Sequence, residues 1–358
     1  MKYLTYLTLA VVLFSACSKD DDPAPEPTPT PGGSSGTNPI TGSAWVTVDA
    51  DFDEQVYDMA TYDNSLWLVY SDFSSGTTQF SYTGTYSGTS VSSRFQTAIG
   101  SGTGFDELFV YNDGFFARGA LGPYGVFEYS KTANRWEPKY QSPGSFVNVY
   151  AFTQYNGNGV LAASDAPYVY IDNGGVLAGV GSGTDDLVRT LLEYNGDLIA
   201  AGEFTNAGGT SANYIARWNG SAWQPLGTGT NGAIEHLIEY DGKLIAAGDF
   251  TTAGGQSANH IAAWNGTAWE PLGAGIQSQS FNAAINDMTV HGNELFVGGD
   301  FSGAGTVTTD HIAKWDGSTW SALGGGAPDA VGAVAVYNEQ LYIVDAYSFT
   351  PNFLLRLE

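Results

Sequence analysis

The chain has 358 residues, of which 37 are acidic and 12 basic, giving a formal net charge of −25 at pH 7. So negative a surface disfavours phosphate backbones and anionic lipid faces, so we do not expect a nucleic acid as partner. The single cysteine excludes a disulfide within the chain.

The first sixteen residues have the anatomy of a secretory signal peptide. Lys2 precedes an apolar run from Leu4 to Phe14, and the small residues Ser15 and Ala16 follow. The run is shorter than the roughly 20 apolar residues of a membrane-spanning helix, so a retained anchor helix is the weaker interpretation. We therefore predict a lipoprotein-type signal over residues 1–16.

Residues 14–17 read FSAC and resemble the lipobox of bacterial lipoproteins, with phenylalanine in place of the usual leucine. The resemblance implies that Cys17 is acylated and becomes the mature N-terminus, because two or more acyl chains hold a protein on a membrane. An ordinary signal peptide with a chance cysteine is the alternative. Residues 18–22, SKDDD, look like the tag that sends lipoproteins of Bacteroidota-type bacteria to the cell surface; a charged, solvated spacer is the alternative.

The next segment is composed mainly of Pro, Thr, Ser and Gly up to residue 42, so it cannot bury a core. We predict a tether over residues 17–43, which at about 3.1 Å per residue reaches roughly 80 Å from the membrane. The folded domain is expected over residues 44–358. We expect an outer-membrane protein that faces the cell exterior and contacts the membrane only through its lipid anchor.

Beyond the tether the sequence repeats, and a marker residue before a tight turn shows the period. The markers are separated by 49, 44, 39, 46, 51 and 46 residues. These spacings are typical of propeller blades rather than of solenoid coils, and seven markers predict seven blades. The markers are Tyr62, Tyr111, Tyr155, Tyr194, Tyr240, His291 and Tyr337.

Three copies, starting at Leu191, Leu237 and Met288, are plain. Each has two apolar runs, a Gly-rich stretch and two more runs, which predicts four strands. Asn-Gly or Asp-Gly pairs separate the runs, and we predict two-residue type I′ hairpins there. These pairs are Asn195-Gly196 and Asp241-Gly242 after the first strands, and Asn219-Gly220 and Asn265-Gly266 after the third strands.

The two ends of the domain complement each other. The last unit stops at Glu358 after three strands, while residues 42–46 (GSAWV) match residues 220–224 (GSAWQ) of a fourth strand. We therefore predict an all-β, seven-bladed β-propeller of four-stranded blades, closed by the N-terminal strand joining the last blade. Such closure removes exposed sheet edges.

The repeats resemble the kelch-like repeats of fungal cortical cell-polarity marker proteins and of many uncharacterised bacterial surface proteins. The resemblance rests on the WNG…W pattern of residues 218–223 and 264–269 and is strong over residues 185–325. Among the first three blades only Trp136 keeps the pattern. The resemblance implies a binding or scaffold protein and carries no catalytic residues.

Residues that recur at one place in several blades are assigned to the blade itself. Eight of the nine tryptophans recur in this way and are predicted to fill the core between sheets. We interpret the recurring acids Glu203, Asp249 and Asp300 as turn caps rather than as cation ligands. The recurring residues Tyr214, His260 and His311 are likewise not expected to bind a metal.

Two positions in the first strand of each blade vary and are mostly polar, although apolar positions flank them. If both hairpins lie on one face, these residues open onto the other face, at the mouth of a central channel. Clustered carboxylates there raise one another's pKa or recruit a cation, while the alternative is a wet channel that tolerates polar residues. The candidate ligand-binding residues are Tyr57, Asp58, Asp106, Glu107, Tyr150, Arg189, Glu235, His236, Asn286 and Asp287.

These features favour a non-enzymatic binding or scaffold protein for a protein or glycan partner, either as a monomer or within an outer-membrane complex. No catalytic residue and no cofactor are assigned, and Ca²⁺ in the channel is left open. The alternative is a glycan-processing hydrolase or lyase that uses paired channel carboxylates about 5 to 9.5 Å apart. Aromatic residues outside the repeat, which serve either as partner anchors or as core, are Tyr82, Tyr86, Phe116, Tyr124 and Tyr347.

Overall fold

The computed structural model describes residues 39–48, 55–72, 80–88, 90–96, 104–111, 113–121, 124–141, 148–278, 285–346 and 354–358. Every helix or strand within these ranges is a β-strand, so the predicted all-β class is confirmed. The described part of the chain contains no helix with the length and apolar character needed to cross a membrane. The predicted signal, Cys17 and the tether up to residue 38 lie outside the described residues.

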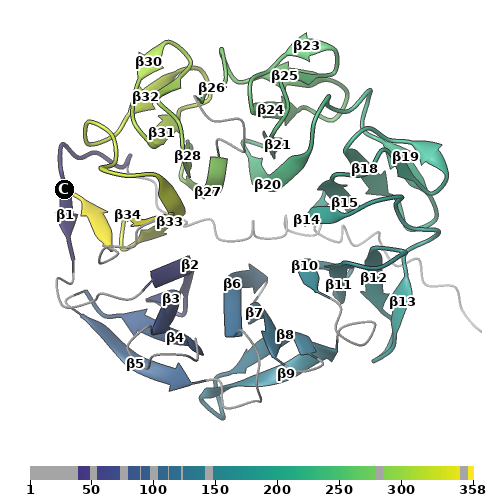
Figure 1. The fold of residues 1–358 in the computed structure, drawn as a ribbon, viewed down its shortest axis with the longest axis horizontal. Coiled ribbons are helices and arrows are strands. Elements are labelled where there is room, and N and C mark those ends of the chain that lie inside the picture. Colours follow the sequence, from purple (N-terminus) through teal and green to yellow (C-terminus); the bar gives the residue numbers. More distant parts are fainter. Residues whose placement is uncertain are drawn as a thin grey trace, which may run out of the picture.

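The described residues form seven antiparallel sheets of four strands, which stand around a central axis (Figure 1). We number the sheets by the chain order of their innermost strands. Sheets 1 to 3 consist of strands that follow one another directly in the chain. Sheet 1 holds β2 (Gln55–Tyr62), β3 (Ser65–Asp72), β4 (Phe80–Tyr86) and β5 (Val91–Gln96); sheet 2 holds β6 (Gly104–Tyr111), β7 (Gly114–Leu121), β8 (Tyr124–Ser130) and β9 (Arg135–Gln141); sheet 3 holds β10 (Val149–Tyr155), β11 (Asn158–Ala163), β12 (Val169–Asp172) and β13 (Leu177–Gly179).

Sheets 4 to 6 share one pattern, in which a short β-hairpin is inserted between the second and third strands. Sheet 4 holds β14 (Val188–Tyr194), β15 (Asp197–Gly202), β18 (Ile215–Trp218) and β19 (Trp223–Pro225), with β16 (Asn206–Ala207) and β17 (Thr210–Ser211) inserted; sheet 5 holds β20 (Ile234–Tyr240), β21 (Lys243–Gly248), β24 (Ile261–Trp264) and β25 (Trp269–Pro271), with β22 (Thr252–Ala253) and β23 (Gln256–Ser257) inserted. Sheet 6 holds β27 (Ile285–His291), β28 (Glu294–Gly299), β31 (Ile312–Trp315) and β32 (Trp320–Ala322), with β29 (Gly303–Ala304) and β30 (Val307–Thr308) inserted and joined by β26 (Ile276–Gln277).

Sheet 7 combines both ends of the described chain. Its strands are β33 (Val331–Tyr337), β34 (Gln340–Asp345), β35 (Leu355–Leu357) and β1 (Trp45–Thr47). The pairing of β1 with β35 sets Trp45 opposite Leu357. Ile40, which the sequence places in the tether, is only 4% exposed and packs in the hydrophobic cluster between sheets 6 and 7. The folded body therefore starts earlier than the predicted boundary at residue 44.

The turns after the first strands have the predicted geometry. Asn195 and Gly196 have φ angles of 52° and 78°, and Asp241 and Gly242 have 51° and 67°. A type I′ turn requires a left-handed backbone at both central residues, so these two predicted turns are confirmed. We call the face on which these turns lie the turn face, and the opposite end of the inner strands the mouth face.

The predicted type I′ turns after the third strands are wrong. Trp218 pairs with Trp223, so four residues rather than two connect β18 and β19. The side-chain Oδ1 of Asn219 accepts hydrogen bonds from the backbone N–H groups of Ser221 (3.0 Å) and Ala222 (2.9 Å). The asparagine thus builds the turn with its side chain, as Asn and Asp commonly do, and only Gly220 of the pair has a positive φ, at 89°.

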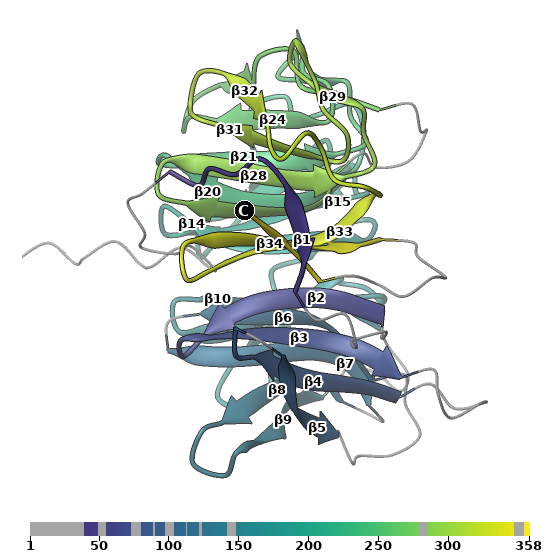
Figure 2. The same cartoon turned by 90° about the vertical axis from the view of Figure 1, so that its left-hand side faces the viewer.

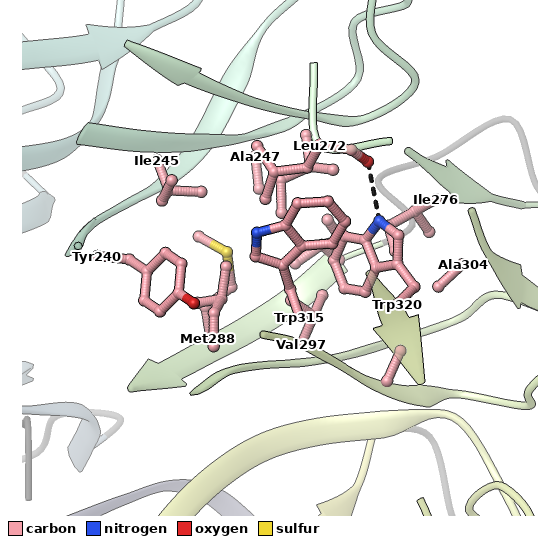
Figure 3. Close-up of a cluster of buried hydrophobic side chains, with 14 of the residues drawn as sticks. Tyr240, Ile245, Ala247, Leu272, Ile276, Met288, Val297, Ala304, Trp315 and Trp320 are labelled. Carbon is pink, nitrogen blue, oxygen red and sulfur yellow. Dashed lines mark hydrogen bonds between the residues drawn. The ribbon is translucent and has the colours of Figure 1, made fainter. Parts of the chain in front are cut away.

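The core lies between neighbouring sheets, and the cluster between sheets 5 and 6 shows how it is built (Figure 3). The indole of Trp320 is 6% exposed, and its Nε1–H donates to the Leu272 carbonyl oxygen at 2.8 Å. The ring of Trp315 lies 5.3 Å from that of Trp320. Buried indoles that donate to a neighbouring sheet or to the loop beside it join one sheet to the next, which confirms the core role predicted for Trp136, Trp223, Trp269 and Trp320.

Candidate functional site

The inner strand of every sheet contains a β-bulge near its start. The pairing of β2 with β3, for example, shifts register between Val56 and Asp58, so Tyr57 has no opposing residue. A bulge bends the strand and redirects a side chain. Because each bulge falls on the first of the two variable positions, it explains why these positions vary while their apolar neighbours do not. The bulged residues are Tyr57, Asp106, Tyr150, Arg189, Glu235, Asn286 and Gly332.

All ten predicted site residues line one cavity of about 450 Å³ at the mouth face. A second cavity of about 160 Å³ continues between the inner strands and is lined largely by apolar residues. Three carboxylates, Asp58, Glu107 and Asp287, belong to the walls of both. They therefore lie where the polar mouth passes into the narrower channel.

The side chains of Asp58 and Asp287 connect neighbouring sheets. Asp58 Oδ1 accepts from the N–H of Met59 and Oδ2 from that of Leu108 in sheet 2, both at 2.7 Å. Asp287 does the same with Met288 and with Val334 in sheet 7, again at 2.7 Å. An inner strand has no partner strand on its channel side, so these carboxylates satisfy backbone donors that the sheets leave unpaired.

The channel disfavours charge on these two groups. Burial, reinforced by the charges of Asp287 and Glu107, raises the pKa of Asp58 well above its usual range, although two backbone N–H groups oppose the shift. Burial also raises the pKa of Asp287 against the effect of its own two N–H donors. Carboxyl groups in this situation hold protons more tightly than exposed ones.

Arg118 of β7 neutralises the carboxylates of sheet 2. Its Nε lies 2.9 Å from Asp106 Oδ1, and its Nη1 lies 3.0 Å from Glu107 Oε2. The same guanidinium donates to the backbone oxygen of Tyr150 in sheet 3. Burial raises the pKa of Glu107 even though Arg118 acts to lower it. The cluster thus joins sheets 2 and 3 and fixes both acids.

A second cluster, centred on Arg189, joins sheets 3, 4 and 5. Arg189 Nε donates to Glu203 Oε1 at 2.8 Å and lies 3.9 Å from Glu235 Oε2. Its guanidinium carbon lies 4.9 Å from the ring centroid of Tyr150, a cation–π contact. Burial raises the pKa of Glu235, while Arg189 lowers it. The role predicted for Glu203 as a turn cap is therefore wrong, because its carboxylate forms an ion pair with a mouth residue.

His236 and Asn286 complete the wall. Burial lowers the pKa of His236 to about 4, and a hydrogen bond with the backbone of Ile285 acts in the opposite direction, so the imidazole is neutral at pH 7. Asn286 Nδ2 donates to the Val331 carbonyl oxygen of sheet 7 at 2.8 Å. The mouth therefore combines ion pairs on the side of sheets 2 to 5 with neutral, bridging groups near sheets 5 to 7.

Sequence reasoning missed Arg118. The residue stands in the second strand, at a register position that other sheets fill with a small or apolar residue, such as Ala201 in sheet 4 or Ala247 in sheet 5. The variable pairs in the first strands were recognised because they differ from blade to blade. The same comparison of register positions, made for the second strands, identifies Arg118. Of the aromatic residues proposed as anchors, Tyr86 and Phe116 are 1% and 2% exposed and belong to the core. Tyr347 and the side chain of Tyr124 lie outside the described residues.

Within the described ranges, no group of three or more His, Cys, Asp or Glu side chains is arranged to hold a metal ion. The described contacts of the mouth acids are with arginine, with backbone N–H groups, or with both. Such a wall offers a partner hydrogen-bond acceptors, two guanidinium groups and tyrosine rings. It is therefore chemically suited to recognition of a polar ligand.

Comparisons with known proteins give the fold. A family described as "Domain of unknown function (DUF5122) beta-propeller" matches residues 195–220 and 241–262, within sheets 4 and 5. A chain in the "Crystal Structure of Mitotic Checkpoint Complex" is similar over 98% of this chain and 99% of its own length, with a TM-score of 0.54 and 13% sequence identity. No curated protein matches the sequence. The chain thus has a β-propeller domain, and at this identity the structural likeness shows the fold alone.

Proposed function

We propose that this protein is a non-enzymatic binding or scaffold module that recognises a protein or glycan partner at the mouth of its channel. One observation carries the proposal: a bulge in each inner strand aims a different residue at the mouth, and six of these seven residues line the same cavity with their side chains. Side chains that vary within a fixed frame are characteristic of a site grafted onto a scaffold.

The frame that we propose is a closed, seven-bladed propeller in which each four-stranded sheet is one blade. The strand β1 supports this closure, because it supplies the fourth strand of sheet 7. A hydrogen bond across the seam also supports it: Tyr337 of sheet 7 donates to the Asn64 carbonyl oxygen of sheet 1 at 3.2 Å. Equivalent bonds join other neighbours, as from Tyr194 to Gly242 at 2.8 Å.

Localisation follows from the N-terminal sequence. We propose that Cys17 is lipidated after removal of residues 1–16 and that the protein is held at the outer membrane, facing the exterior. The lipobox-like residues and the acidic residues after them support this proposal. The folded part would then reach the medium on the tether, either as a monomer or as a subunit of a membrane complex.

A glycan-cleaving enzyme is the second candidate, and the raised pKa values of Asp58 and Asp287 are the observation in its favour, since a general acid needs such a pKa. Their contacts favour the binding function. Both oxygens of each carboxylate accept backbone N–H groups, so proton transfer to a substrate would compete with bonds between sheets. Substituting Asp106, Glu107 and Asp287 together should leave glycan turnover unchanged for a binding protein and abolish it for an enzyme.

The binding function is tested with the double variant Tyr150→Ala/Arg189→Ala, which removes a tyrosine ring and a guanidinium from the wall of the mouth. Glycan arrays and capture of surface proteins from the native membrane, each quantified by titration, should show a partner that wild type binds and the variant does not. The control is Lys243→Ala, which breaks an ion pair with Glu270 beside the turn face (2.8 Å). A partner bound equally by all three proteins would contradict the proposed site.

A further inference from the structure

The segment before β1 is clamped to the face of sheet 6 that packs against sheet 7. Glu294 Oε2 accepts from the backbone N–H of Ile40 at 3.0 Å, and Lys314 Nζ donates to the Ile40 carbonyl oxygen at 3.0 Å. Glu294 and Lys314 also pair with each other, and their side chains are only 12% and 16% exposed. Both backbone groups of one residue are thus held by charged partners, while its side chain is buried.

Sheet 4 has an ion pair of the same kind, and no N-terminal segment docks on it within the described ranges. Asp197 and Arg217 occupy the register positions of Glu294 and Lys314, with an N–O distance of 3.3 Å. Their side chains are 24% and 46% exposed. The pair thus occurs in sheets 4 and 6 but not in sheet 5, where Lys243 and Ala263 hold these positions, and the N-terminal segment makes a specific use of it in sheet 6.

The clamp lies on the turn face. Glu294 pairs with His291 directly beside the turn that follows β27, whereas the mouth residue Asp287 pairs with Gly298 near the opposite ends of β27 and β28. Figure 2 shows the purple N-terminal segment passing β28 before it reaches β1. Ile40 is thus fixed at the end of the sheet that is remote from the channel mouth.

We infer that the clamp on Ile40 makes the channel mouth the surface turned away from the membrane, so that it receives a partner arriving from the external medium. The inference rests on the proposed anchoring through Cys17 and deepens the proposed function. With the tether held at the turn face, the mouth meets the bilayer only if the tether folds back along the sheets. That path restricts the tether and costs conformational entropy.

The orientation is tested with the full, lipidated chain in vesicles that contain an acceptor-labelled lipid. A donor dye is placed on Asp186→Cys, just before β14 begins at the mouth face, or on Ala222→Cys, in the turn between β18 and β19 at the turn face; both positions are exposed. Energy transfer to the membrane should be stronger from Ala222→Cys than from Asp186→Cys. Equal transfer, or stronger transfer from Asp186→Cys, would overturn the orientation. Failure of the protein to float with the vesicles would instead overturn the anchoring.

The clamp itself is tested by amide hydrogen exchange at Ile40. Lys314→Met keeps much of the apolar stem but removes the donor, so exchange at Ile40 should become faster. Arg217→Met, the matched change in sheet 4, should leave that amide unchanged. Unchanged exchange in both variants would show that the clamp does not hold the segment, and it would remove the basis for the inferred orientation.

Discussion

Sheets 4 to 6 and sheets 1 to 3 reach the same architecture by different means. In sheets 4 to 6 the contact is repeated: the indole N–H groups of Trp223, Trp269 and Trp320 donate to equivalent carbonyl oxygens at 2.9, 2.9 and 2.8 Å. Sheets 1 and 2 instead gather aromatic rings of several kinds. Trp136 there bonds to the hydroxyl of Thr83 and packs against the ring of Phe115 at 5.0 Å.

The comparison of the two groups of sheets shows which features the fold requires and which belong only to the repeat motif. Third and fourth strands of four and three residues suffice in sheet 4, whereas those of sheet 1 have seven and six. The bulge at the mouth is common to both groups of sheets, although the repeat motif is not. The bulged positions of the mouth therefore depend on the inner strands, with Arg118 and Glu203 added from the second strands and the turns after them, and the third and fourth strands are left to vary.

The largest expected effect tests whether the two kinds of core are equivalent. Trp269→Ala and Trp136→Ala each remove a buried indole, so each should lower the free energy of unfolding by about 3–5 kcal/mol. The aromatic cluster should differ in its coupling. A double-mutant cycle between Trp136 and Phe115 should give about 0.5–1.5 kcal/mol of interaction energy, measured by chemical denaturation. If only Trp269→Ala lowered the free energy of unfolding, the aromatic cluster around Trp136 would not stabilise the fold as the repeated core does.

Sheets 4 to 6, which share the repeat motif, are also the part of the fold that the sequence predicted best. The period, the strand count and the variable pairs in the inner strands all follow from residues that recur at fixed spacing. The turn after β18 did not follow, because Asn-Gly serves both a two-residue turn and the four-residue turn built by the Asn219 side chain. The docking of Ile40 did not follow either, since one apolar residue between Pro39 and Thr41 forms no periodic pattern.

A smaller effect tests the seam between sheets 7 and 1. Tyr337→Phe removes the hydrogen bond to Asn64, and Tyr194→Phe removes the equivalent bond between sheets 4 and 5. If the ring is closed, each variant should lose about 1 kcal/mol of unfolding free energy, because each bond crosses a packed sheet interface. Thermal and chemical denaturation measure both. If Tyr194→Phe lowered the free energy of unfolding and Tyr337→Phe did not, the seam between sheets 7 and 1 would be open, and the proposed closure of the ring would be wrong.

The smallest effect compares two neighbouring repeats through a loop acid. Burial opposes the ionisation of Asp185, but hydrogen bonds from Asn206 and Thr205 outweigh it and lower its pKa to about 2. In sheet 5 the corresponding Asn231 accepts from the backbone N–H groups of Thr251 and Thr252, both at 2.8 Å, without a charge. The two loops thus share one geometry and differ in titration.

The sign of the pH dependence follows from the lowered pKa. A carboxylate whose folded pKa lies below its unfolded value of about 4 stabilises the protein above that value, and the contribution is lost as the pH falls from about 4 to about 2. In this pH window, Asp185→Asn should therefore lose less stability than wild type, and Asn231→Asp should lose more. At pH 7 the stability of Asp185→Asn should differ little from that of wild type. Urea denaturation at several pH values measures the slopes. Identical acid slopes in all three proteins would mean that the loop bonds are as strong to a protonated acid as to a carboxylate, and that the two repeats do not differ in this respect.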